Sequence, residues 1–158
     1  MKTILLLAPV VVVFLIVGTS LYVRLAPTDP QAWHIDPEDP ALKSGTNMFL
    51  LRGDSDVQSR VYGLSPDALL ARLADVALAT PRTRAIAGSV KAGRMTFITR
   101  SKLYGYPDFT TVTTVPVGGS RGELVIYARS RFGVGDHGVN RARVMGWLRE
   151  LRDLEVLE

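Results

Sequence analysis

The stretch from Phe109 to Arg131, F-T-T-V-T-T-V-P-V-G-G-S-R-G-E-L-V-I-Y-A-R-S-R, decides the fold of this 158-residue chain. It contains two runs rich in β-branched and aromatic residues, Phe109–Val117 and Glu123–Arg131, and the glycine-rich segment Gly118–Gly122 separates them. Such runs are typical of strands, and a short glycine-rich connection between them is typical of a hairpin. The stretch therefore predicts two neighbouring antiparallel strands.

The residues before this stretch repeat the same pattern. Thr83–Val90 and Arg94–Thr99 read as strands, and Lys91-Ala92-Gly93 between them reads as a second tight hairpin. Asn47–Arg52, N-M-F-L-L-R, is a short apolar run that suits a first strand. Together these runs predict an antiparallel sheet of about five strands.

Two amphipathic helices are expected beside the sheet. The first begins with Ser65 as N-cap and Pro66 at the first helical position, and Pro81 ends it. The second runs from Val139 to Leu154, where the apolar residues recur at helical spacing. A run of strands between two helices is typical of an α+β fold, and we expect both helices to pack on one face of the sheet.

The amino-terminal run from Ile4 to Val23 contains no charged residue, and Lys2 and Arg24 flank it. As a helix it would be about 30 Å long, which matches the hydrocarbon core of a bilayer. We therefore expect residues 1–24 to form a transmembrane anchor that contacts the lipid bilayer through Ile4 to Val23.

A cleaved signal peptide is the alternative for this segment, because Gly18 and Ser20 provide small residues for a cleavage site. The apolar run continues past them through Leu21–Val23, which favours an uncleaved anchor. We expect a single-pass protein of a bacterial inner membrane, with its carboxyl-terminal domain on the periplasmic, extracytoplasmic side.

Residues 25–45 are expected to form an extended tether without helix or strand, because four prolines with aspartate neighbours fall within them. We expect Trp33 and Ile35 to attach this segment to an apolar surface, either of the domain or of a neighbour. The remaining residues, 46–158, are expected to form one small α+β domain of ordinary size.

Charge and cysteine content restrict the function classes. The chain holds 19 basic and 15 acidic residues, and two of the basic ones, Lys2 and Arg24, flank the apolar run. The rest of the chain therefore has a net charge of only +2, which argues against nucleic acid as a partner. The chain has no cysteine, so a thiol-bound lipid or metal is excluded.

Two sequence patterns resemble catalytic motifs. Gly118–Gly122 fits G-x-S-x-G, but the nucleophile elbow needs a helix after the turn, and a strand is predicted here. Gly133–Gly138 fits G-x-G-x-x-G, but the dinucleotide fold needs a further parallel strand that the sequence does not contain. We therefore expect neither a hydrolase with Ser120 as nucleophile nor a nucleotide-binding protein.

Metal and acid–base chemistry have few candidate residues. The two histidines, His34 and His137, are 103 positions apart, and Asp54 with Asp56 is too small a set for a calcium loop. His137 is the one candidate general base. We expect no metal, no cofactor and no enzymatic activity.

The glycine loop before the last helix is the strongest candidate binding site. Backbone N–H groups at a helix start favour anions, and arginine binds carboxylate and phosphate groups with two parallel hydrogen bonds. The candidate anion site comprises Arg129, Arg131, Gly135, Asp136, Gly138, Asn140 and Arg143.

The alternative for these residues is structural. Asp136 and Asn140 would then cap the helix, and the arginines would pair with Asp108, Asp136 or loop carbonyls.

The segment Y-A-R-S-R-F-G-V-G-D-H-G-V-N-R-A-R-V-M-G-W-L, which spans residues 127–148, resembles the family of domains of unknown function numbered 1499. The matching residues are Arg129, Ser130, Arg131, Gly133, Asp136, Gly138, Asn140 and Arg143. The resemblance covers residues 45–152 and implies a small α+β domain without an assigned activity. Many relatives carry an acidic run where this chain has Pro107–Thr111, so Asp108 is what remains of it.

These features favour a non-catalytic accessory protein that presents its small domain to a larger membrane protein complex. The alternative is a binding module for an anionic lipid or a small acid at the arginine-flanked glycine loop.

Overall fold

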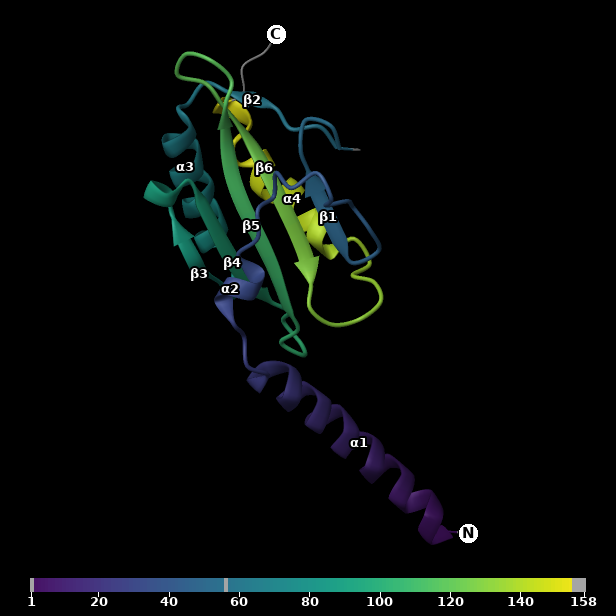
Figure 1. Cartoon of the computed structure of the whole chain (residues 1–158). Helices are drawn as coiled ribbons and strands as arrows, with labels where there is room; N and C mark the ends of the chain where they lie inside the picture. Colours follow the sequence, from purple (N-terminus) through teal and green to yellow (C-terminus); the bar gives the residue numbers. More distant parts are fainter. Residues whose placement is uncertain (1, 56, 155–158) are drawn as a thin grey trace.

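The computed structural model describes residues 2–55 and 57–154, with the side chains of the first helix described from Pro9 onward. The fold is built on one sheet, with helices on both faces of that sheet (Figure 1). The helices are α1 (Lys2–Leu25), α2 (Pro30–Trp33), α3 (Pro66–Ala79) and α4 (Val139–Arg149). The strands are β1 (Met48–Leu51), β2 (Val61–Tyr62), β3 (Thr83–Ser89), β4 (Arg94–Arg100), β5 (Pro107–Pro116) and β6 (Gly122–Ser130).

The sheet has six strands in the order β1-β6-β5-β4-β3, and β2 also pairs with β6. Every pairing is antiparallel. Both predicted hairpins form: Gly93 turns the chain between β3 and β4 with φ 71°, and residues 117–121 join β5 to β6. The predicted count of about five strands is one too low, since the two-residue β2 is too short to give a sequence pattern.

Helices α3 and α4 cover one face of the sheet, behind it in Figure 1. Ser65 caps α3 by accepting a hydrogen bond from the Ala68 N–H, and Pro66 occupies the first turn. Leu69, Leu70 and Leu73 of α3 are fully buried against the sheet. The apolar residues that recur at helical spacing in the sequence therefore form the face of α3 that packs into the core.

The last helix is shorter than predicted. α4 ends at Arg149, and a 3-10 helix, η2 (Arg152–Leu154), follows it in place of a continuous helix to Leu154. Its core contacts are kept, because Val144, Trp147 and Leu151 are all buried.

The opposite face of the sheet is covered by residues 26–45, which we call the strap. The strap crosses the sheet in front of β5 and β6 in Figure 1. Trp33 stacks on Phe109 of β5 with ring centroids 3.8 Å apart, so the predicted attachment through Trp33 is found. The expectation that this segment lacks a helix is wrong, since α2 forms from Pro30 with Asp29 as its N-cap.

Strand β3 contains an irregularity near its middle. Its register against β4 shifts between Ala85 and Ala87, so Ile86 is an extra residue in a β-bulge. Gly88 follows the bulge with φ 77°, and a Cβ atom there would lie 2.0 Å from the Arg94 carbonyl oxygen. Only glycine fits this position.

Helix α1 projects from one end of the domain (Figure 1). Its last turns contact the domain: Val23 is 2% exposed, Ser20 Oγ donates to the Tyr104 carbonyl, and Arg24 donates to the carbonyls of Leu103 and Tyr104.

Among the helices that the structure describes, none is long and apolar enough to cross a membrane. The described side chains of α1 begin at Pro9, and a helix from there to Leu25 is about 26 Å long, with its last turns held by the domain. The expected transmembrane anchor over residues 1–24 is therefore wrong, and so are the single-pass inner-membrane placement and the periplasmic side that depend on it. The portion of the expected span from Ile4 to Ala8 lies outside the described side chains.

Candidate functional site

A buried polar network lies between α4 and the sheet. Arg143 of α4 and Asp108 of β5 form an ion pair, with Nη1 3.0 Å from Oδ2 and side chains 8% and 12% exposed. Ser130 of β6 donates its hydroxyl to the other Asp108 oxygen at 2.6 Å. Asn140 donates from Nδ2 to Ser130 Oγ at 3.0 Å and accepts from Arg143. Four side chains from three elements are thus joined by hydrogen bonds and an ion pair.

Asp136 caps the start of α4. Its two oxygens accept from the N–H groups of Gly138 at 2.9 Å and Asn140 at 2.8 Å. Hence the N–H groups that we expected to face a bound anion already donate to a carboxylate of the chain itself. This arrangement agrees with the capping alternative for Asp136.

Two of the predicted site residues lie on the far side of the sheet. The Arg129 guanidinium stacks over Trp33 at 4.7 Å and donates to its carbonyl oxygen at 3.0 Å. Arg131 donates to Thr28 Oγ1 of the strap at 3.2 Å. Burial lowers the pKa of Arg129, and both arginines hold the strap on the sheet.

The seven residues of the predicted anion site therefore do not converge. Asp136, Gly138, Asn140 and Arg143 lie together at the start of α4, whereas Arg129 and Arg131 face the strap. Gly135 packs near the Thr46 carbonyl oxygen, in the loop between the two groups.

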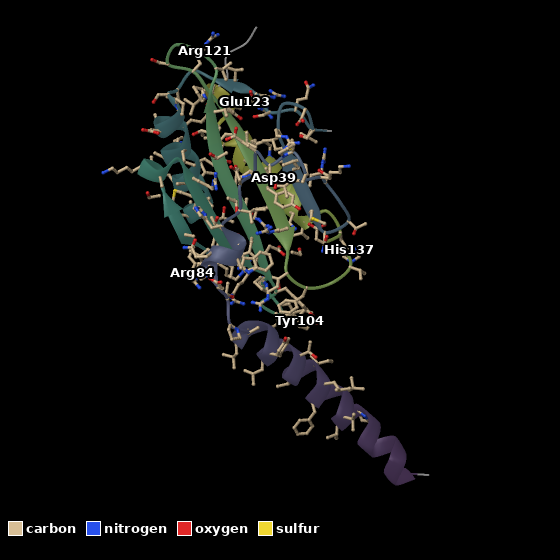
Figure 2. All side chains as sticks on the ribbon, in the orientation of Figure 1. Asp39, Arg84, Tyr104, Arg121, Glu123 and His137 are labelled. Carbon is tan, nitrogen blue, oxygen red and sulfur yellow. The ribbon has the colours of Figure 1, made fainter. Side chains whose placement is uncertain are left out.

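The two residues considered for hydrolysis lie far apart. Ser120 is in the exposed β5–β6 turn, and His137 is exposed in the loop before α4 with φ 52°. Figure 2 shows His137 and Arg121, the neighbour of Ser120, at opposite ends of β6. The G-x-S-x-G match is therefore a hairpin turn, as its sequence context predicts.

A cleft of about 1080 Å³ opens between α3 and α4 on the same side as the buried network. Trp147, Thr99 and the Asp108–Arg143 pair line it, and all of them are buried or nearly so. Val76, Ala79, Pro81, Val139, Ala142 and Gly146 add apolar lining. Clefts of roughly this size are the usual sites for small molecules.

The cleft is rich in cations. Its basic lining residues are Arg72, Arg82, Arg100, Lys102, Arg143 and Arg149. Only three acidic residues line it, and one of them, Asp108, is already paired with Arg143. The surplus of positive charge favours a negatively charged occupant.

One buried donor in the cleft lacks a partner. In residues 2–55 and 57–154, four buried side-chain polar atoms make no hydrogen bond, and they belong to Ser59, Arg94, Thr110 and Arg143. Only Arg143, through its Nε, also lines the cleft. An unpaired buried donor costs free energy, so such a group calls for a bound water or ligand.

Sequence reasoning found Arg143 but missed the cationic rim of the cleft. Arg72 and Arg149 come from the outer parts of two helices, and Arg82 comes from a turn. Their proximity depends on how α3 packs beside α4, which no local pattern indicates. In the described part of the chain, no three potential metal-binding side chains gather.

The family comparison covers most of the chain. The profile of the family described as protein of unknown function (DUF1499) matches residues 25–151. The chain belongs to this family. The match confirms the predicted resemblance and begins 20 residues earlier, so this DUF1499 domain includes the strap. A comparison with curated proteins gives no match.

The structure gives a physical role to the motif through which the family resemblance was identified. Ser130, Asn140 and Arg143 of this DUF1499 member bind Asp108 or one another, and Asp136 caps the helix that carries two of them. Much of the motif therefore fixes α4 against the sheet, next to the cleft.

Proposed function

We propose that this chain is a non-catalytic binding module that holds a small organic acid in the cleft between α3 and α4. The observation that carries the proposal is the buried, incompletely bonded Arg143 in a cleft with a surplus of cations. A carboxylate beside the rim arginines would gain charge-assisted hydrogen bonds. The apolar lining residues suit the carbon skeleton of such an acid.

The proposal keeps the ligand class that the sequence suggested and moves its position. The N–H groups at the start of α4 donate to Asp136, so they offer little to a ligand. The cleft runs along α4 from Val139, and Arg143, one turn along the helix, lines it together with the rim arginines of α3 and of the turn after it. These groups are supplied by packed elements, which hold a site more precisely than a loop does.

The test uses the two tryptophans, which lie on opposite faces of the sheet. Trp147 lines the cleft, and Trp33 belongs to the strap on the other face, so Trp33→Phe leaves one indole at the site. We expect saturable changes in its fluorescence when succinate or citrate is added at low salt. Because the rim charges would contact the acid, Arg72→Gln combined with Arg149→Gln should weaken binding about tenfold or more.

The matched control is Arg121→Gln, which removes one charge from a distant hairpin turn (Figure 2). It should leave the affinity for both acids unchanged. Fluorescence that does not saturate, or equal weakening by the control and by the rim variants, would refute a specific acid site.

A second candidate function, an accessory protein that docks on a larger protein complex, is supported by one observation. Helix α1 exposes a continuous set of apolar side chains, and Phe14 among them is 74% exposed. Monomeric proteins rarely leave such patches uncovered. A photo-crosslinking residue at Phe14 should capture a defined partner in cells, and the same residue at Arg121 should not. Equal products from both positions would argue against docking through α1.

A further inference from the structure

A second cavity, of about 390 Å³, lies where α1 meets the domain. Nine residues line it, and five of these are cations: Arg24, Arg82, Arg84, Arg100 and Lys102. None of the nine is acidic. Figure 2 shows Arg84 at the end of the sheet from which α1 projects, the same end as Tyr104. We call this cavity the junction pocket.

Three of the four guanidinium groups in the junction pocket are held in place without being neutralised. Arg24 donates to the carbonyls of Leu103 and Tyr104 at 3.1 and 3.3 Å. Arg100 donates to the Gly105 carbonyl at 2.9 Å, and Arg82 donates from Nε to the Arg100 carbonyl at 3.0 Å. Carbonyl oxygens fix a side chain but carry no net charge, so the positive charges remain uncompensated.

Three arginines outside the junction pocket do have a carboxylate partner. Arg52, Arg94 and Arg143 each pair with an aspartate. Within the described residues, Arg84 and Lys102 make no side-chain hydrogen bond or ion pair. The junction pocket therefore gathers five cations with no carboxylate among its lining residues.

Clustering these cations in the junction pocket is electrostatically unfavourable, because like charges repel one another. Burial lowers the pKa of Arg100, and the positive charges of Arg84, Arg131 and Arg24 lower it further. Arg82 adopts φ 62°, a left-handed conformation that is unfavourable for a side chain of its size. Strained backbone and mutually repelling charges are typical of sites that bind an opposite charge.

We propose that the junction pocket binds a phosphoryl group. Up to five cations face a cavity without a carboxylate, and a phosphate monoester carries about two negative charges at pH 7. Arginine's planar fork donates two parallel hydrogen bonds to phosphate oxygens. Because carbonyl contacts already fix three of the guanidinium groups, little side-chain freedom is lost on binding.

The pocket is distinct from the α3–α4 cleft, although the two share Arg82, Arg100, Ser101 and Lys102. Arg84 and Ile98 belong to the junction pocket alone, and they project from the sheet face that the strap covers. Trp147 and Arg143 belong to the cleft alone, on the other face. Variants at Arg84 and at Arg72 therefore separate the two sites.

The experiment uses the full-length protein in a nonionic detergent, because α1 exposes apolar side chains. Isothermal titration at low salt would compare inorganic phosphate, glycerol 3-phosphate and a soluble short-chain phosphatidic acid. Saturable binding is expected. Tighter binding of the phosphatidic acid would identify a lipid headgroup as the source, and equal or tighter binding of the other two would identify a free phosphate compound.

Arg84→Gln should raise the dissociation constant for phosphate at least about tenfold, since it removes a charged donor of the pocket. Its control is Arg121→Gln, which has the same charge change in the distant hairpin and should shift the constant less than twofold. A second variant, Gly105→Ala, moves a cation of the pocket without removing its charge. The added Cβ would lie 2.8 Å from Arg24 Cγ and displace the Arg24 side chain. It should also weaken phosphate binding.

Three results would overturn the proposal: no saturable phosphate binding, equal weakening by Arg84→Gln and Arg121→Gln, or acetate binding as tightly as phosphate. Loss of succinate binding in Arg84→Gln would show that the two cavities are one site. Failure of succinate to bind, with phosphate binding intact, would reject the small-acid function and leave the junction pocket standing.

Discussion

Asp136 shows how a single carboxylate ends a loop and begins a helix. Each of its oxygens accepts one N–H group of the first turn of α4, while the nearby arginines have other partners. Asp136→Ala should therefore lower the free energy of unfolding by about 1 kcal/mol. Asp136→Asn keeps one acceptor oxygen, so it should cost less.

Urea denaturation of the two variants measures the difference. Equal and large losses for Asn and Ala would mean that the negative charge, rather than the cap, is what the fold requires.

The Asp108–Arg143 pair is the most deeply buried ion pair among the described residues, and its partners are interdependent. Arg143→Met would leave the carboxylate buried without its cation, at a cost of about 3–5 kcal/mol. Asp108→Asn combined with Arg143→Met leaves no buried charge, so the double variant should be more stable than Arg143→Met alone. A double-mutant cycle by urea denaturation checks this, and simple additivity of the two single losses would contradict it.

At the scale of elements, the strap is bonded to the sheet through a titratable group. His34 Nδ1 lies 2.8 Å from Thr96 Oγ1, and Thr96 in turn bonds Thr111, whose hydroxyl donates to the Trp33 carbonyl. Burial, and then the charge of Arg94, lower the pKa of His34 below its ordinary value of 6.5. The folded state therefore takes up this proton less readily than the unfolded state.

The pH dependence follows from that difference. The contribution of neutral His34 to stability should be complete above pH 6.5 and should decrease as the pH falls below 6.5 toward the lowered pKa of the folded state. Urea denaturation at pH 7.5 and pH 5.5 should show a smaller loss for His34→Gln than for the unchanged chain. His137→Gln, at an exposed loop position, serves as control, and equal losses in all three proteins would contradict the role of His34.

Elements with a local pattern could be predicted, and those that depend on distant packing could not. The Ser65–Pro66 start of α3 and the two glycine-containing hairpins formed as expected. The pairing of β1 with β6 joins residues about 80 positions apart, and no periodicity indicates it. Helix α2 is a single turn within a proline-rich segment that otherwise reads as extended.

The candidate site predicted from the sequence combined residues from both faces of the sheet, although the alternation of side chains along a strand separates them. Arg129 and Ser130 are adjacent in sequence, yet they face opposite sides of the sheet. The period of two along a strand is a property of the sequence, and it suffices to place these two neighbours on different faces. The basic rims of both cavities could not be foreseen, because their arginines come from separate helices, strands and turns that only the folded chain brings together.

At the scale of the whole molecule, the two faces of the sheet are stabilised by different kinds of contact. Helices α3 and α4 bury the apolar core on one face, and the strap covers the other with an aromatic stack and hydrogen bonds. The two cavities share residues at the start of β3 and the end of β4, at one end of the sheet.

The bulge in β3 affects whether copies of the protein can pair through the edges of their sheets at high concentration. A straight outer strand offers its free N–H and C=O groups to any other extended chain, and polymeric fibres grow by that route. The extra residue at Ile86 and the obligatory glycine at Gly88 bend β3 and break the regular spacing of these groups. The opposite border is formed by β1 and β2, which are four and two residues long. Among the described strands, neither edge of the sheet therefore presents a long, regular row of free N–H and C=O groups to another copy.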